Sequence, residues 1–399
     1  MSNETHKIGV WTATITGMNA MIGAGIFTAP VVLGTAKIGP SAILTYIFVV
    51  ISVWFIAQSL ARVAYRYPQE GSFYTYAKQW GGHFLGIIAS VSYLIGAIMA
   101  IGLIAKIAGS YLHYIFPAIS GNILGMLVLT TIIIINLFGA ALSQLGQKIL
   151  IICTVFPIIA AIIMCFSKAD TTLLTSFAPK GIGGILQATR LAIFGFFGFE
   201  SAASLFNIVK NPEKNVPKAI TYSIVIVGIL YILFVSSIVI SVPLSWFSSP
   251  EIPLSAVLGK LFPTHRWLII IIHLSILSAM IGTIHSLVWG TSHLTTAIFK
   301  KLKSNTAKVL LASGFSNLKS AVAVVGALSF TFFLTIKKID LFFYFAAILI
   351  VFSYTTSIIP LLSIKEEWKS KQNIKTIIGI ATAMIIFYFA LEGIIKELI

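Results

Sequence analysis

The sequence consists of a series of strongly apolar stretches, most of them about 20 residues long, separated by short polar segments. A helix of about 20 residues spans the hydrocarbon core of a bilayer, whereas the strands of a membrane barrel alternate polar and apolar residues. Hydrophobic residues make up 58% of the chain and charged residues 10%. A soluble domain could not cover its surface with so few polar residues. The sequence therefore predicts an all-α integral membrane protein without a separate soluble domain.

About eleven stretches are long and apolar enough to be membrane spans, with ends set to within several residues. We expect the first and the sixth to be broken. The expected spans cover residues 9–35, 40–61, 84–112, 121–141, 149–166, 185–208, 219–242, 267–299, 319–336, 340–363 and 374–392.

The formal net charge of +16 raises the question of a nucleic-acid ligand. The basic residues lie in many short loops and form no stripe with interleaved aromatic residues, so no nucleic-acid partner is expected. If the N-terminus is cytoplasmic, 17 of the 27 lysines and arginines lie on the cytoplasmic side. The positive-inside rule therefore predicts a multi-pass protein of the inner or plasma membrane, with its N-terminus inside and its C-terminus outside.

The first span contains the segment from Gly17 to Pro30, in which Gly23 and Gly25 flank Ala24. Glycine lets the backbone leave helical geometry at low cost, and irregular backbone inside hydrocarbon is tolerated only around a cavity enclosed by protein. The amides at the start of the resumed helix would face this cavity and attract a carboxylate. The alternative is a seam of small residues between packed helices.

The sixth span has a second unusual segment, in which Gly195 and Gly198 enclose two phenylalanines and Glu200 follows. The other acidic residues fall in loops or near span ends, which leaves Glu200 as the one acid deep in the membrane. A carboxyl group at that depth is costly and marks a pathway or a proton relay. It is equally consistent with a capping role in the first turn of a resumed half-helix.

The two interrupted spans are five spans apart, so consecutive five-span halves have opposite orientations in the bilayer. This is the pattern of an inverted repeat in a secondary transporter. We expect a single domain over residues 1–399, with a first repeat at about 9–166, a second at about 185–363 and an extra span at about 374–392. One half-helix start would bind a carboxylate, and the carbonyl end of the other, near Phe194, an amine or a cation.

Three further segments carry weaker signals. Residues 62–82 are rich in aromatic side chains and either pack against the inner mouth of the protein or form part of an interfacial aromatic belt. Residues 254–261 have apolar positions at helical spacing, which predicts a short helix over the outer vestibule or at the interface. Lys106 and Arg190 are expected to extend along their spans to the outer interface.

The eighth span contains His273, His285 and His293 together with Trp289. The spacing of the histidines does not form a pair of metal ligands, and no acid or cysteine accompanies them, so neither a metal nor another cofactor is expected. Trp289 either forms a wall of the cavity or packs as an ordinary core residue. Cys153 and Cys165 share one span and indicate no disulfide framework.

Four segments together resemble the amino acid-polyamine-organocation (APC) transporters, especially the branch of basic amino acid and polyamine exchangers. These segments are Gly23–Pro30, Pro68–Tyr76, Phe194–Ser201 and Lys210–Ile220, and with the span pattern they cover nearly the whole chain up to the tenth span. The resemblance favours a binding loop over a packing seam at the glycines of the first span.

The resemblance implies a LeuT-like fold of five plus five inverted helices that works by alternating access. The substrate-binding residues that it implies are Ile22, Gly23, Ala24, Gly25, Phe194, Phe197 and Trp289. The backbone of the first four would hold the carboxylate, Phe194 would be an aromatic gate, and the backbone near Phe197 would receive the amine. Glu200 matches the glutamate of the family's sixth span, which implies a role in proton coupling or gating.

Three features depart from the family pattern. Some proton-coupled relatives have a lysine in the fifth span, and residues 149–166 contain none, which puts that coupling route in doubt. The family usually has about twelve spans, one more than expected here. Phe194 stands where tryptophan is frequent and His293 where many members have arginine, so the substrate class stays open.

Together these features predict a secondary active permease for amino acids or related amines, acting as an exchanger (antiporter) or a proton-coupled symporter and not as an enzyme. A polyamine transporter and a non-transporting amino acid sensor on the same fold are alternatives. A membrane-embedded enzyme would need a nucleophile or a metal beside the histidines of the eighth span. The expected partners are a small-molecule substrate and the lipid bilayer, and a homodimer is compatible with the sequence.

Overall fold

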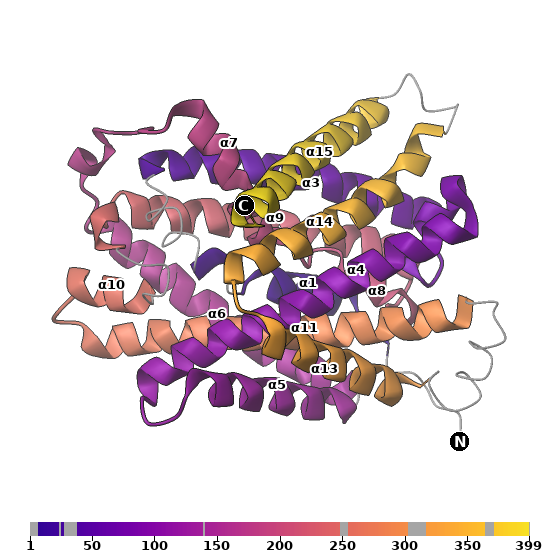
Figure 1. Cartoon of the computed structure of the whole chain (residues 1–399), viewed down its shortest axis with the longest axis horizontal. Coiled ribbons are helices and arrows are strands. Elements are labelled where there is room, and N and C mark those ends of the chain that lie inside the picture. Colours follow the sequence, from indigo (N-terminus) through magenta and orange to yellow (C-terminus); the bar gives the residue numbers. More distant parts are fainter. Residues whose placement is uncertain are drawn as a thin grey trace.

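The architecture comes from a computed structural model that describes residues 7–23, 25–27, 38–138, 140–247, 254–301, 317–363 and 371–398. Apart from one isolated β-bridge between Ile8 and Val209, the regular structure of these residues is helical. Many of the long helices cross the molecule in roughly the same direction (Figure 1). The expected all-α fold is therefore confirmed.

The long helices follow from the apolar stretches, because a helix satisfies its backbone polar groups internally where no water is present. Eight helices of the described residues are long and apolar enough to span a membrane, and α5 is a shorter apolar helix. The helices are α1 (Val10–Met21), α3 (Ala42–Arg66), α4 (Ser72–Ile115), α5 (Gly121–Leu137), α6 (Ala140–Phe166), α7 (Gly181–Ala192), α8 (Ser201–Ser204), α9 (Pro212–Val239), α10 (Leu254–Leu261), α11 (Arg266–Lys301), α13 (Leu318–Thr335), α14 (Ile339–Ile358) and α15 (Lys371–Leu398). The expected total of about eleven spans stays a prediction.

The helix bundle has two ends, which we call the α7 side and the α8 side. On the α7 side, the amide of Ser41 donates a 2.8 Å hydrogen bond to the carbonyl of Phe177 and joins the start of α3 to the segment before α7. On the α8 side, the amide of Lys210 donates a 2.9 Å bond to the carbonyl of Ile8. This second bond joins the segment after α8 to the segment before α1, so the chain enters α1 and leaves α8 at the same end.

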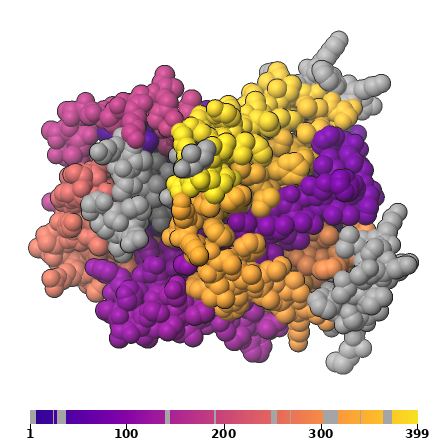
Figure 2. All heavy atoms as spheres, viewed as in Figure 1, coloured from indigo at the N-terminus to yellow at the C-terminus, as the bar shows by residue number. Residues whose placement is uncertain are grey.

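Helix α4 crosses the bundle diagonally and contacts α5, α11, α13 and α14 (Figure 1). Small residues allow the close approach: a Cβ atom at Gly102 would lie 2.9 Å from the carbonyl oxygen of Ser329 in α13. Helix α3 packs on α9 and α15, and α1 contacts α6, α9 and α11. In the space-filling view, α4, α13, α14 and α15 cover much of the face turned to the viewer (Figure 2).

Helix α4 begins at Ser72, inside the aromatic segment of residues 62–82. Gly82 has φ 70° and ψ −169°, which interrupts the helix geometry between residues 72–81 and the long apolar part of α4. Phe73 and Tyr76 are fully buried. The segment therefore packs against the protein, and the aromatic-belt interpretation is wrong for these two residues, because burial among neighbouring helices replaces contact with the interface.

Two of the weaker expectations are resolved on the α7 side. The short helix is confirmed as α10, whose Leu254, Val257 and Leu258 are buried. The ammonium of Lys106 donates a 2.7 Å hydrogen bond to the carbonyl of Ile336, the residue that caps the C-terminal end of α13. The ammonium group of Lys106 thus lies at the C-terminal end of α13, where the helix dipole favours a positive charge. The sequence does not reveal this partner. The side chain of Arg190 lies outside the described residues.

Candidate solute site between the two helix interruptions

The last turn of α1 is stabilised by side chains from two other helices. Helix α1 ends at Met21, Ile22 has a non-helical ψ of 84°, and residues 25–27 are helical again. Ala24, one of the predicted site residues, lies outside the described residues. The hydroxyl of Tyr231 donates a 2.6 Å bond to the Met21 carbonyl, and Thr283 Oγ1 donates a 2.8 Å bond to the Asn19 carbonyl. Carbonyls that a helix end leaves without intrahelical partners are therefore paired with α9 and α11.

The second interruption follows α7. The helix passes into a 3₁₀ turn at Ile193–Phe196, the backbone is extended at Phe197, and α8 begins at Ser201. Gly198 has φ +119°, a conformation that favours glycine. A Cβ atom there would also lie 2.5 Å from the Cβ of Ala20. Glycine at this position therefore permits both the non-helical backbone before α8 and the close approach to α1.

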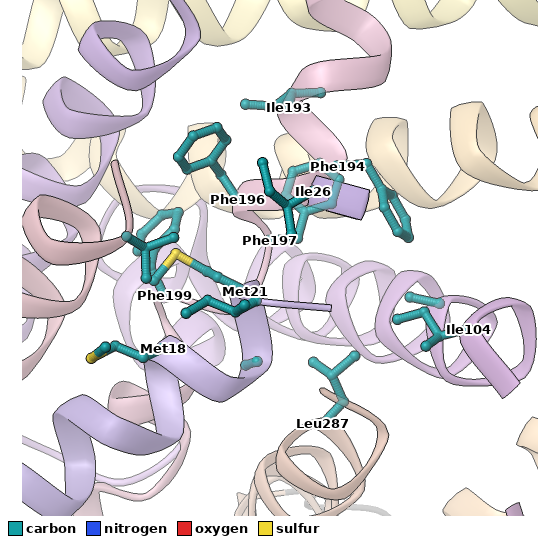
Figure 3. Close-up of a cluster of buried hydrophobic side chains, with 14 of the residues drawn as sticks. Met18, Met21, Ile26, Ile104, Ile193, Phe194, Phe196, Phe197, Phe199 and Leu287 are labelled. Carbon is teal, nitrogen blue, oxygen red and sulfur yellow. The ribbon is translucent and has the colours of Figure 1, made fainter. Parts of the chain in front are cut away.

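The two interrupted segments are in direct contact. A Cβ atom at Gly25 would lie 2.6 Å from Cα and 2.9 Å from N of Gly195. Figure 3 shows Met21, Ile26, Phe194 and Phe197 close together where the two chain segments meet. Polar backbone from both interruptions is thus concentrated in one region of the bundle.

A small cavity lies at this contact, with a volume of about 20 Å³. That is room for about one water molecule, so the cavity is closed to an amino acid. The residues that line it are Ala20, Met21, Gly23, Gly25, Ala100, Ile104, Phe194, Phe197, Thr283 and Leu287. Apart from the Thr283 hydroxyl these side chains are apolar, and none of them carries a charge. The Phe194 ring lies 4.3 Å from Phe343, centroid to centroid, and helps to close the α7 side of the cavity.

The structure brings together four of the predicted site residues, Gly23, Gly25, Phe194 and Phe197, as cavity lining. Ile22 is fully buried next to them in the chain. Trp289 is also buried, but it is not among the described residues that line the cavity. Its ring instead makes an edge contact with His293 on the same helix, with centroids 6.0 Å apart. In this structure Trp289 therefore packs against its own helix and does not form a wall of the cavity.

Glu200 is buried on the α8 side and does not line the cavity. The hydroxyl of Tyr93 in α4 donates a 2.7 Å hydrogen bond to Oε1, and the amide of Gly198 donates a 3.0 Å bond to Oε2. The Phe73 ring packs on Tyr93 with centroids 4.3 Å apart. The carboxyl group therefore connects the turn before α8 to α4, and the aromatic segment at the start of α4 covers this connection.

A buried amide cluster lies behind α1. Asn19 Nδ2 donates 2.7 Å hydrogen bonds to the backbone carbonyl and to Oε1 of Gln147 in α6. Ser286 Oγ of α11 donates a 2.8 Å bond to the same Oε1. Neutral polar contacts thus join α1, α6 and α11 beside the cavity, in the part of α6 that precedes the span expected at residues 149–166.

The three histidines of α11 have separate surroundings. His285 Nδ1 lies 2.9 Å from Asn136 Nδ2, and His273 Nδ1 lies 2.7 Å from Ser255 Oγ, while His293 contacts Trp289. Within the described ranges, no three His, Cys, Asp or Glu side chains are grouped so that they could hold a metal ion.

Sequence reasoning missed Tyr93, Gln147 and Thr283 as parts of the site. Each is a polar side chain within a long, mainly apolar helix, and that was the available signal, because buried polar groups need partners. The signal does not name the partner: Tyr93 and Glu200 are 107 residues apart, and Asn19 and Gln147 are 128 apart.

The fold is shared with a solved structure. The crystal structure of MhsT in complex with L-phenylalanine aligns over 96% of this chain and 98% of that chain, with a TM-score of 0.65 and 14% sequence identity. The expected LeuT-like fold is thereby confirmed.

Two curated relatives are transporters by name. An uncharacterised transporter of Mycobacterium tuberculosis (strain ATCC 25618 / H37Rv) is 25% identical over 295 residues, which is 73% of this chain and 66% of the relative. The branched-chain amino acid permease BcaP of Bacillus subtilis (strain 168) is 24% identical over 275 residues, 63% of this chain and 58% of the relative. The matched segments thus cover less than two thirds of either relative. Since the sequence profile of the amino acid permease family matches residues 8–395, this membrane protein belongs to that family of transporters.

Proposed function

We propose that the chain moves a neutral amino acid with an apolar side chain across the membrane by alternating access. The observation that carries this proposal is the cavity at the contact of the two helix interruptions, which is lined by glycines of the first interruption and by uncharged, mainly apolar side chains. Ligand pockets of this composition use a few polar groups for orientation and apolar contacts for affinity.

The backbone around the cavity suits a zwitterion. Helical geometry resumes at residues 25–27, and the dipole at the start of a helix favours a carboxylate. The carbonyls at the end of the 3₁₀ turn, near Phe194, lie at a negative helix end that favours an ammonium group. The two groups of an amino acid would therefore each meet a complementary partial charge without any charged side chain.

The side-chain lining argues for an apolar solute over a basic amino acid or a polyamine. A second ammonium group in this cavity would be desolvated without an acid to pair with, because Glu200 is bonded to Tyr93 and Gly198 away from the cavity. Ala100, Ile104 and Leu287 instead offer contacts to an aliphatic side chain. The name of the relative BcaP, a branched-chain amino acid permease, agrees with this choice.

Solute entry requires the bundle to open, because the cavity holds only about one water molecule. The α8 side is suited to opening. Many of its buried side chains have a polar atom without a hydrogen-bond partner in the described part of the chain, namely Ser72, Tyr76, Ser204, Asn207, Trp289, Ser292, His293, Ser353, Ser357 and Asn373. Hydration would satisfy these atoms. With the N-terminus in the cytoplasm, as the positive-inside rule predicts, the α8 side is the cytoplasmic exit.

The test is uptake of labelled leucine into proteoliposomes, with excess unlabelled valine, phenylalanine, lysine or putrescine as competitors. We expect saturable uptake that valine and phenylalanine inhibit and that lysine and putrescine leave unchanged. Inhibition by lysine and putrescine alone would overturn the choice of solute and favour the exchanger branch. Binding of leucine without flux would identify a sensor instead of a transporter.

Two vesicle conditions separate the coupling modes. Uptake that needs unlabelled leucine inside the vesicles indicates exchange, and uptake driven by an imposed proton gradient indicates symport. Glu200 is the residue proposed to link transport to protons, and its two hydrogen bonds also give it a positioning role at the start of α8.

A further inference from the structure

A second and much larger cavity lies between the end of α4, helix α10 and the start of α11. Figure 1 shows α10 and the start of α11 at the α7 side of the molecule. Its volume is about 620 Å³, which is in the size range of small-molecule binding pockets. Much of the lining is apolar and includes Ile115, Phe262, Ile269, Ile270 and Leu274. The solute site near Gly25 shares none of these residues, so the cavity is a separate feature of the fold.

The cavity opens toward the surface that contacts lipid. Ile270 and Leu274 line it and are 60% and 52% exposed, although both belong to a membrane-spanning helix. Exposed apolar side chains on such a helix face hydrocarbon. Tyr114 and the neighbouring Trp267 are also exposed, and aromatic side chains of this kind are enriched where the hydrocarbon meets the head groups. The mouth of the cavity therefore lies at the depth where the acyl chains of a lipid are joined to its head group.

The rim of the cavity carries positive charge. Arg266 lines the cavity at the first residue of α11, and Lys260 lies in the last turn of α10. No aspartate or glutamate is among the described residues that line the cavity. A guanidinium group binds phosphate through paired hydrogen bonds, so a cation above an apolar groove is complementary to an anionic phospholipid.

The inner wall of the cavity is held by a polar junction of three helices. His273 of α11 is buried, its Nδ1 lies 2.7 Å from Ser255 Oγ of α10, and its Nε2 lies 3.1 Å from the carbonyl oxygen of Tyr111 in α4. The rings of Tyr111 and Tyr114 lie 5.4 and 5.5 Å from the His273 ring. Because these contacts fix α10 to both α4 and α11, the wall is preformed and a ligand would not need to order it.

We propose that this cavity binds an anionic phospholipid of the leaflet on the α7 side, with an acyl chain against Ile270 and Leu274 and the phosphate at Arg266. The proposal does not depend on which solute the protein carries. It assigns a lipid site to a surface where α10, the short helix over the α7 side, meets two spanning helices.

Native mass spectrometry of the detergent-purified chain tests the proposal, with phosphatidylglycerol and phosphatidylcholine of identical acyl chains as the probes. The wild-type protein is expected to retain one phosphatidylglycerol in preference to phosphatidylcholine. Arg266→Gln is expected to reduce this preference about fivefold while keeping the lipid itself. Lys168→Gln, a change at an exposed cation on the same side, serves as its control and is expected to change nothing.

A second variant fills the cavity. A Cβ atom at Gly259 would have only Ile269 within 4 Å, at 3.8 Å, so Gly259→Phe places a ring in the cavity without backbone strain. We expect loss of both lipids, whereas Gly183→Phe, at an open position on α7, keeps them. If Gly259→Phe does not fold, Ile270→Trp at the exposed mouth is the replacement.

Three results would overturn the proposal. The first is wild-type retention of both lipids to the same degree, and the second is unchanged lipid retention in the filled variant. The third is displacement of phosphatidylglycerol by inorganic phosphate alone, which would show that the acyl chain contributes nothing. If filling the cavity instead removes a second bound leucine and leaves the lipid in place, the cavity is a solute site and not a lipid site.

Discussion

The α7 side and the α8 side of the central cavity are closed by different kinds of contact. On the α7 side, aromatic rings form the closure: Phe194 packs on Phe343, and Phe196 packs on Tyr231 with centroids 4.9 Å apart. On the α8 side, aromatic rings such as Phe73 and Tyr93 are combined with polar groups such as Glu200, among many buried polar atoms that have no partner in the described part of the chain.

The two kinds of contact also differ in the free energy that is needed to separate them. Apolar rings lose favourable contacts when they separate and gain nothing from water. A buried polar atom without a partner costs about 1–3 kcal/mol, which is recovered when water reaches it. Under the proposed function, the α8 side therefore opens at lower cost than the α7 side, and both sides meet at the glycine contact of the two interruptions.

The largest effect is expected at that contact, from Gly25→Leu. A Cβ atom there would already lie 2.6 Å from Cα of Gly195, so the side chain of a leucine at position 25 must push the two interruptions apart. Overpacking costs of this kind reach about 3 kcal/mol, and we expect leucine binding to weaken about 100-fold or more. Scintillation proximity binding on purified protein measures this, and proteoliposome uptake should be abolished.

The control for this variant separates binding from folding. Gly183→Leu carries the same new side chain at a position with nothing within 4 Å, and it should bind and transport as the wild type does. Gly25→Leu should elute as the same monodisperse species in size exclusion. Normal leucine uptake by Gly25→Leu would contradict the proposed site.

The next effect concerns the polar closure and is expected from Glu200→Gln. The glutamine amide can accept from Tyr93 but presents an NH₂ group to one of the two donors, so one hydrogen bond to the carboxylate is lost. Such a bond contributes about 1.5–3 kcal/mol, which shifts the α8 side toward the open state by about tenfold or more. Labelling of Ser204→Cys by a membrane-impermeant maleimide, in a background with Cys153 and Cys165 replaced, should become faster.

The same variant tests proton linkage. If Glu200 exchanges a proton during transport, the dependence of uptake on pH should flatten in Glu200→Gln. An unchanged pH profile would refute proton linkage and leave Glu200 with the positioning role alone. Glu392→Gln is the matched control, because Glu392 belongs to α15 and pairs with Lys396 on the α7 side, remote from the solute site. It should alter neither labelling nor pH dependence.

A smaller effect is expected where the cavity meets the α8 side. Leu287 lines the cavity and Trp289 does not. Leu287→Ala should therefore enlarge the space for the solute side chain and shift the preference from valine toward phenylalanine by several-fold, at about 0.8 kcal/mol per methylene group. Trp289→Phe should leave this preference unchanged. Competition of each amino acid against labelled leucine measures both, and a shift caused by Trp289→Phe would extend the site toward the α8 side.

The sequence was sufficient for the kind of fold and for the segments that meet at the site. Long apolar stretches predict spanning helices, and Gly23 and Gly198 stand where the structure has non-helical backbone, while Gly25 begins the resumed helix. Partners across helices were not predictable. Spans that are apolar on all faces do not reveal which face turns inward, so the pairs Tyr93 with Glu200 and Asn19 with Gln147 appear only in three dimensions. For the same reason, the sequence left open whether Trp289 forms a cavity wall or packs in the core, and a role for it in substrate binding stays a prediction.

The smallest effect is expected at a polar contact on the surface of the α7 side. Asp170 caps a short 3₁₀ helix, and hydrogen bonds from the hydroxyl and the amide of Thr172 hold the pKa of this carboxyl below its ordinary value. A lowered pKa means that the contact stabilises the fold above the ordinary pKa of aspartate and that this stabilisation is lost as the pH falls through the lowered value. Because Asp170 is exposed, the loss should be minor.

Asp170→Asn keeps an acceptor oxygen, and its thermal midpoint at neutral pH should lie within about 1 °C of the wild type, with unchanged leucine uptake. A clear fall in uptake would mean that closure of the central cavity on the α7 side also depends on polar contacts, and the contrast between the two closures would then no longer hold.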